Sequence, residues 1–86
     1  MSNWHRRTLE AVFRNPVSAT IVWADVESML VHYGAVIGES EGSRVSINLR
    51  GRVAHVHRPH PRKEASRMMI REIRELLTAA GIGVNE

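Results

Sequence analysis

Four side chains that could carry out acid–base chemistry on a phosphate lie between residues 44 and 60. They are three histidines, His55, His57 and His60, and one arginine, Arg44. Histidine changes its charge near neutral pH and can therefore act as a general base or a general acid. Arginine keeps its proton and can stabilise negative charge on a phosphate. Proton transfer to and from a phosphodiester is thus open to this set, provided that the fold brings its members together.

A β-hairpin is the element predicted to position these residues. Apolar and polar residues alternate from 44 to 49, the pattern of a half-buried strand. Arg50 and Gly51 suit a two-residue turn, because glycine readily takes the positive φ that such turns require. This register pairs three sets of residues on the core face: Val45 with Val56, Ile47 with Ala54, and Leu49 with Arg52.

The opposite face of the hairpin collects the polar side chains. The same register predicts two cross-strand pairs there, at contact distance: Arg44 with His57, and Ser46 with His55. Pro59 and Pro61 end the second strand, because proline has no N–H to donate to a ladder. They hold His60 in an extended loop beside it. Two imidazoles and a guanidinium are therefore predicted to share one sheet surface.

Composition excludes several classes of site. The 86 residues are enough for one small domain, and they include no cysteine, which rules out disulfides and thiolate chemistry. No carboxylate lies near the His-x-His pair in sequence to complete a metal site, so we predict no metal and no cofactor. There is no apolar run of about 18 residues and no signal-peptide pattern. We expect a cytoplasmic protein without a membrane partner.

Positive charge is concentrated in the second half of the chain. The net charge is +3, but residues 44–74 hold nine lysines and arginines against two glutamates. Such a field favours a polyanion, of which nucleic acid is the commonest, although a solvated basic face would look the same. The residues that we predict to contact RNA are Arg44, Ser46, Arg52, Arg58, Arg62, Lys63, Arg67 and Arg71.

Periodicity predicts the remaining elements. Helices are expected at residues 4–14 and 23–33, a strand at 35–39, and a last helix from about residue 64 or 65 to the stop at Gly81. We expect His5 to be solvent-exposed, and His32 to be either a surface residue or a packed residue at the rim, without a function. The last five elements form an α+β domain of order α-β-β-β-α, with helices on one face of a three-stranded sheet and the other face open. This is the layout of a double-stranded-RNA-binding domain, here with an extra N-terminal helix.

Several segments, taken in order, resemble the HicA toxins of bacterial HicA–HicB toxin–antitoxin pairs. They are Gly42-Ser43 at a strand start, residues 59–64 at a strand end, the Ile/Arg-rich helix 70–77, and Ala80-Gly81-Ile82. The resemblance implies an α-β-β-β-α core at residues 23–82, with residues 1–16 as a helical extension of a single domain spanning 1–86. It also implies a toxin that cleaves mRNA without an obligatory metal and is neutralised by HicB, which covers the active surface.

The sequence departs from the family at one position. In HicA proteins the catalytic histidine directly follows the Gly-Ser pair, and here that position is Arg44. Because arginine does not release its proton near neutral pH, Arg44 cannot act as the base.

Three interpretations remain open. In the first, which we favour, His57 deprotonates a ribose 2′-hydroxyl, Arg44 stabilises the pentacoordinate phosphate, and His55 or His60 protonates the leaving 5′-oxygen. In the second, the protein binds RNA by shape without cutting it. In the third, it is an inactive relative that is retained for its contact with an antitoxin.

Overall fold

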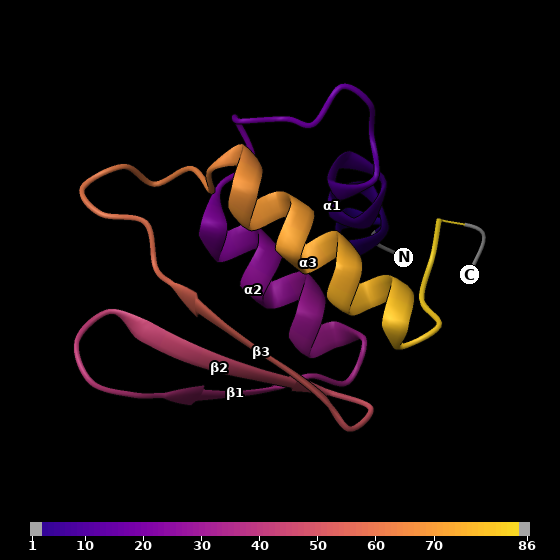
Figure 1. Ribbon diagram of the computed structural model, residues 1–86. Helices are drawn as coiled ribbons and strands as arrows, with labels where there is room; N and C mark the ends of the chain where they lie inside the picture. Colours follow the sequence, from indigo (N-terminus) through magenta and orange to yellow (C-terminus); the bar gives the residue numbers. More distant parts are fainter. Residues whose placement is uncertain (1–2, 85–86) are drawn as a thin grey trace.

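The computed structural model describes residues 3–84 as three helices and one antiparallel sheet of order β1-β2-β3 (Figure 1). The elements in chain order are α1 (Trp4–Val12), α2 (Trp23–His32), β1 (Val36–Glu39), β2 (Arg44–Leu49), β3 (Arg52–His57) and α3 (Arg67–Ala79). Helices α2 and α3 lie side by side over one face of the sheet, and no element covers the other face (Figure 1). The predicted α+β, double-stranded-RNA-binding-like fold is confirmed.

The hairpin has the predicted register. Arg44 pairs with His57, Ser46 with His55 and Val45 with Val56. Both turn residues have positive φ, 53° at Arg50 and 84° at Gly51, as a primed two-residue turn requires. The Asn48 Oδ1 accepts a hydrogen bond from the Gly51 N–H at 3.2 Å. Local backbone chemistry therefore fixes which side chains share a face.

The core lies between the helices and the inner face of the sheet. The inward residues of β2 alternate with exposed or half-buried ones, as the sequence pattern predicts. The largest fully buried side chains of the core come from all three helices, from β2 and from the segment after α3. They are Leu9, Val12, Val26, Met29, Leu30, Val45, Ile47, Leu49, Ile70, Ile73, Leu77 and Ile82. Consequently the helices hold the sheet by its apolar face and leave its polar face free.

Helix α3 begins later than predicted, at Arg67 instead of residue 64 or 65. Ser66 is its N-cap, because the Ser66 Oγ accepts a hydrogen bond from the Met69 N–H at 3.1 Å. The two residues before Ser66 are held outside the helix: Glu64 forms a β-bridge with Val22, and the Ala65 N–H donates to the Ile21 carbonyl. These long-range contacts override the helical pattern.

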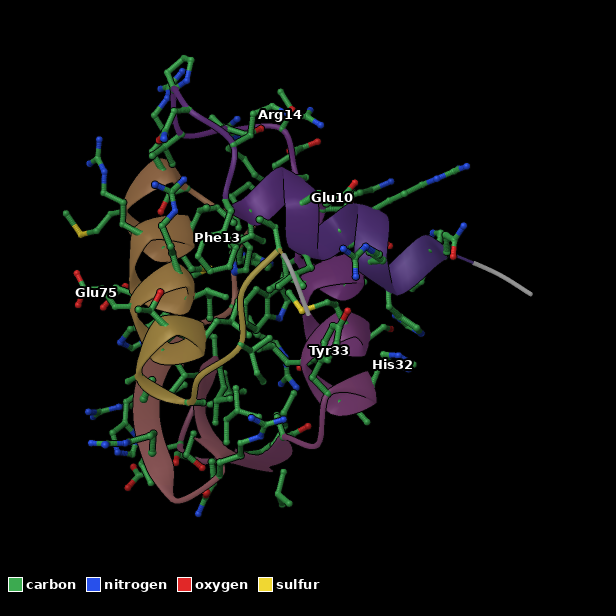
Figure 2. The ribbon with its side chains drawn as sticks, turned by 90° about the vertical axis from the view of Figure 1, so that its right-hand side faces the viewer. Glu10, Phe13, Arg14, His32, Tyr33 and Glu75 are labelled. Atoms are coloured by element: carbon green, nitrogen blue, oxygen red, sulfur yellow. The ribbon has the colours of Figure 1, made fainter. Side chains whose placement is uncertain are left out.

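Helix α1 ends at Val12, two residues earlier than predicted, and Arg74 of α3 occupies its end. The Arg74 guanidinium donates to the carbonyls of Val12 and Arg14 and to the Asn15 Oδ1, at 2.9–3.2 Å. It also lies 5.8 Å from the centre of the Phe13 ring, which packs beside α3 (Figure 2). None of the helices within residues 3–84 is long and apolar enough to cross a membrane.

Candidate nucleic-acid interface

The uncovered face of the sheet brings together three of the four residues that could act on a phosphate. Arg44 from β2 lies opposite His57 from β3, and His55 lies one cross-strand row away, opposite Ser46. Arg44, His55 and His57 are exposed, and with Ser40 and Glu41 they line one open hollow. Two imidazoles and a guanidinium can therefore approach the same phosphate from one side.

Glu41 also lines this hollow, although the sequence predicts only a solvated carboxylate in a turn at this position. It lies in the β1–β2 loop, which is closed by hydrogen bonds from the Ser40 N–H to the Arg44 carbonyl (2.9 Å) and from the Arg44 N–H to the Glu41 carbonyl (3.3 Å). Gly42 has a φ of 65°, which the tight return of the chain requires. A carboxylate here can orient Arg44 or an imidazole. The shortness of the loop before Arg44 is the sequence signal that could have found it.

His60 lies apart from the other histidines. It lines a different hollow, beside the start of α3, together with Arg62 and Arg67. The loop that carries it leaves the sheet after Pro59 and returns to the helical layer, where the Trp23 N–H donates to the Lys63 carbonyl at 2.9 Å. The two candidate histidines that the fold brings together are therefore His57 and His55.

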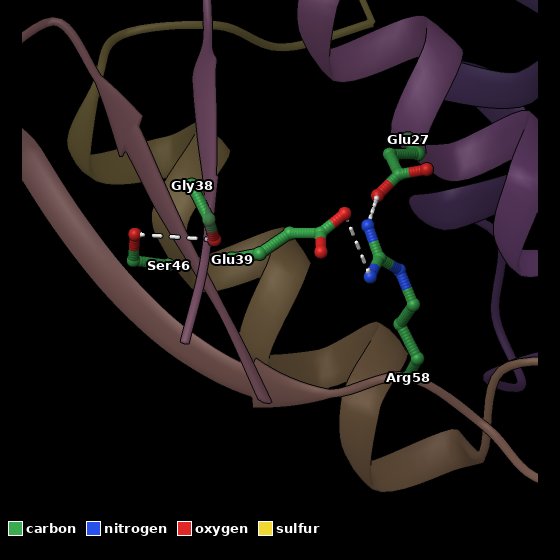
Figure 3. A network of polar contacts seen from close by, with 5 residues as sticks. All are labelled: Glu27, Gly38, Glu39, Ser46 and Arg58. Carbon is green, nitrogen blue, oxygen red and sulfur yellow. Dashed lines mark hydrogen bonds and ion pairs between the residues drawn. The ribbon is translucent and has the colours of Figure 1, made fainter. Parts of the chain in front are cut away.

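Arg58 joins three elements. Its guanidinium lies 3.1 Å from the Glu27 carboxylate of α2 and 3.4 Å from the Glu39 carboxylate of β1 (Figure 3). The hydrogen bond with Glu27 is the main cause that raises the pKa of Arg58 above its usual value. Burial opposes it as the second-largest effect, and the attraction of the Glu27 and Glu39 carboxylates adds to the rise in pKa. Its charge is thus largely matched within the protein, and it adds less to an RNA-binding surface than its place in the sequence suggests.

The other predicted RNA contacts differ in how free they are. Arg52, Lys63 and Arg71 are exposed, and in the described part of the chain their side chains have no hydrogen bond or ion pair. Arg62 has a loose contact with Glu64 at 3.9 Å, and the Arg67 Nε donates to the Val17 carbonyl at 3.3 Å. Arg52, Lys63 and Arg71, whose charges are not paired within residues 3–84, are therefore the cations most available to bind phosphates.

The expectation that His5 is solvent-exposed is wrong, whereas His32 is exposed and lies at the rim of α2, as expected. His5 of α1 is half-buried, and its ring stacks on that of His32 with centroids 4.4 Å apart and planes 18° apart. Tyr33, beside His32 at the end of α2, adds an edge contact at 5.0 Å (Figure 2). Tertiary packing of α1 on α2 creates this pair. Over residues 3–84, no three metal-ligating side chains are grouped to hold a metal ion.

Comparison with known proteins gives one match. Residues 23–82 match the family model described as the HicA toxin of bacterial toxin–antitoxin systems, which is more than half of the chain. No curated protein matches the chain, and no solved structure does. The matched range begins at the first residue of α2 and ends just after α3, so it contains the whole sheet and excludes α1.

Proposed function

The chain belongs to the HicA toxin family of bacterial toxin–antitoxin systems, and on that premise we propose that it is a metal-independent endoribonuclease. The observation that carries the proposal is the hollow on the open sheet face, where Arg44, His55 and His57 lie together. Each of the three has a role in cleaving RNA at a phosphodiester, and none of them is needed in the core.

His57 is the general base of the proposed reaction. It takes the proton of a ribose 2′-hydroxyl, and the oxygen attacks the adjacent phosphorus. Arg44 stabilises the charge that develops on the pentacoordinate phosphate. His55 protonates the leaving 5′-oxygen as the P–O5′ bond breaks. The products are a 2′,3′-cyclic phosphate and a 5′-hydroxyl, and neither an oxidant nor a second substrate is required.

The position of Arg44 explains why the base would be relocated. Arg44 stands where the family has its histidine, and a guanidinium cannot take a proton. His57 is its direct cross-strand neighbour, so an imidazole remains within reach of the same place on the sheet. The exchange turns a histidine position into a phosphate-binding one and moves the base across the hairpin.

The rest of the proposal concerns partners. We propose that mRNA is held by the predicted cations, foremost the unpaired Arg52, Lys63 and Arg71, and that a HicB-like antitoxin neutralises the toxin by covering the open sheet face. Both partners place its action in the cytoplasm. Arg44 also favours a second candidate, a catalytically inactive module that binds RNA or the antitoxin through the same face.

The test is cleavage of a single-stranded RNA by the purified full chain in excess EDTA, with the product ends analysed for 2′,3′-cyclic phosphate. We expect such ends, and we expect His57→Ala to lower the rate by about 100-fold or more. His32→Ala, which removes an exposed imidazole from α2, is the matched control and should cleave at the wild-type rate. RNA methylated at every 2′-oxygen should stay intact.

Each other outcome separates the alternatives. Equal cleavage by wild type and His57→Ala would contradict His57 as the base. Intact RNA in every lane, together with retention of the RNA in a mobility-shift assay, would contradict the nuclease and favour the binding module.

A further inference from the structure

The open face of the sheet continues beyond the histidines, and its far end is apolar. Two further cross-strand rows follow the row of Arg44 and His57. The first is Gly38–Ser46–His55 across β1, β2 and β3, and the second is Val36–Asn48–Val53. Val36 is 71% exposed and Val53 is 55% exposed. Neither valine contributes to the core, and neither has a role in the proposed cleavage reaction.

At Gly38, in the middle row of this face, no side chain projects from the sheet. A Cβ at position 38 would lie 3.0 Å from the Ser46 Oγ, so a side chain here would crowd the serine and fill the space above the strand. The Ser46 hydroxyl instead turns toward the Gly38 carbonyl, at 3.5 Å (Figure 3). The backbone is therefore bare at Gly38, on the β1 side of the row that also holds Ser46 and His55, between the row of Arg44 and His57 and the row of the two valines.

The distances suit a nucleotide close to the reacting phosphate. Rows on one face of a strand are about 7 Å apart, so the valines lie about 14 Å from the row of Arg44 and His57. Three strands span about 10 Å, which is the scale of a nucleobase. The bare backbone at Gly38 lies in the row between the two, separated from His55 by Ser46.

The charge of the strands on this face also suits RNA, while the nearby carboxylates, Glu41 beside the hollow and Glu72 and Glu75 beside Val53 and His55, come from a loop and from α3. The outward side chains of the face within the described strands include no carboxylate, and the one permanent charge among them is that of Arg44: Val36, Gly38, Arg44, Ser46, Asn48, Val53, His55 and His57. The Asn48 Oδ1 is already occupied by the Gly51 N–H. Its amide NH2 group therefore remains to donate to an acceptor on a base edge.

We propose that Val36, Gly38 and Val53 form a base-contact subsite, which holds an unpaired nucleobase near the scissile phosphate. The inference rests on the proposed RNA-cleaving function and adds to it the surface that selects an unstacked nucleotide. Bases inside a duplex are stacked and cannot lie on an apolar strip, whereas those of a single strand can. The histidine hollow then acts on the phosphate that this base brings into place.

The test measures binding and leaves cleavage aside. The probe is a labelled single-stranded oligoribonucleotide with 2′-O-methyl groups, together with a series in which one nucleotide at a time is abasic. The double variant Val36→Thr/Val53→Thr keeps the β-branched shape and replaces one methyl group of each valine with a hydroxyl. Val31→Thr on α2 is the matched control, because Val31 is 54% exposed and lies on a different element.

We expect the double variant to bind the intact oligonucleotide about fivefold more weakly, as the loss of a modest apolar contact implies. One abasic position should weaken wild-type binding and leave little further effect of the double variant, because the two changes remove the same contact. Val31→Thr should bind as the wild type does. Melting curves of both variants should match the wild type, since the substituted side chains are exposed.

Two results would overturn the subsite. One is an equal effect of the double variant on every oligonucleotide of the series, which would mean that the valines touch no base. The other is unchanged RNA binding together with altered self-association in sedimentation, which would make this face an interface between copies. Base-dependent binding without cleavage of ordinary RNA would uphold the subsite and remove the nuclease. Cleavage of ordinary RNA together with binding that does not depend on the base would support the nuclease and contradict the subsite.

Discussion

Arg44 and His57 face each other because the hairpin turn has two residues and no more. Side chains alternate between the faces of a strand, so a slip of one residue would send His57 to the core and bring Val56 to the surface. The proposed active site therefore depends on the backbone of Arg50 and Gly51, both with positive φ. Arg50 further holds the turn in place, because its Nη1 donates to the Ala80 carbonyl at the end of α3, at 3.0 Å.

The conformation of the turn predicts how a single substitution at Gly51 changes the stability of the protein. Gly51→Ala should lower the free energy of unfolding by about 1 kcal/mol, because a Cβ is strained at a φ of 84°. Nothing lies within 4 Å of the added carbon, so the cost is purely conformational. Denaturant unfolding measures it. Gly83→Ala is the matched control, since position 83 has equal space and no positive φ. Equal stability of the two variants would contradict this account of the turn.

Among the secondary-structure elements, α1 is held to the rest of the protein at its C-terminal end, which Arg74 of α3 contacts. Leu9 and Val12 are fully buried in the common core, and Arg74 of α3 holds the carbonyls that follow the last turn of α1. Unpaired carbonyls at a helix end need such donors. We therefore propose that residues 1–16 and the family core at 23–82 fold as a single domain, with α1 as part of it.

Arg74→Ala should destabilise the protein by about 1–2 kcal/mol, because it removes charge-assisted hydrogen bonds to carbonyls that have no other described donor. Arg71→Ala, one turn earlier on α3, removes an exposed arginine without such bonds and should change stability by less than about 0.5 kcal/mol. Thermal or denaturant unfolding of both variants checks the difference. Similar effects of the two substitutions would mean that Arg74 does not anchor α1.

At the scale of the whole molecule, Arg58 joins the end of β3 to α2 and to β1 through Glu27 and Glu39. The sheet and the helical layer are otherwise joined mainly by apolar packing, which has no direction. The ion pairs add a directional link at the end of β3, two residues after Val56 and directly after His57. They thus help to set where the proposed base lies relative to Arg44.

Arg58→Gln should lower the midpoint of thermal unfolding, and by the same amount at pH 7 and pH 9. Folding raises the pKa of Arg58, so its contribution is complete below the pKa of the unfolded chain and is lost only in strong alkali. The effect will be modest, because a third of the side chain is exposed to water. Arg62→Gln is the control, with its 3.9 Å contact to Glu64. A difference that disappears at pH 9 would contradict the ion-pair explanation.

The hairpin, its register and the order of the elements can all be predicted from the amino-acid sequence. These follow from alternation of polarity, from a glycine at the turn and from helical periodicity, all of which act between near neighbours. The same local rules placed Arg44, His55 and His57 on one face before any tertiary contact was considered. The family also followed from the sequence, since the matched residues 23–82 are those that carry the resemblance.

The contacts of the remaining polar residues depend on tertiary packing. Packing brings Arg58 to Glu27, which is 31 positions away in the sequence, and Arg74 to Asn15, which is 59 positions away. It also separates His60 from the other histidines and stacks His5 on His32. It also began α3 at Arg67, where a β-bridge at Glu64 outweighs the helical pattern. None of these follows from local periodicity, because each depends on which distant element packs alongside, and only the folded chain brings those elements together.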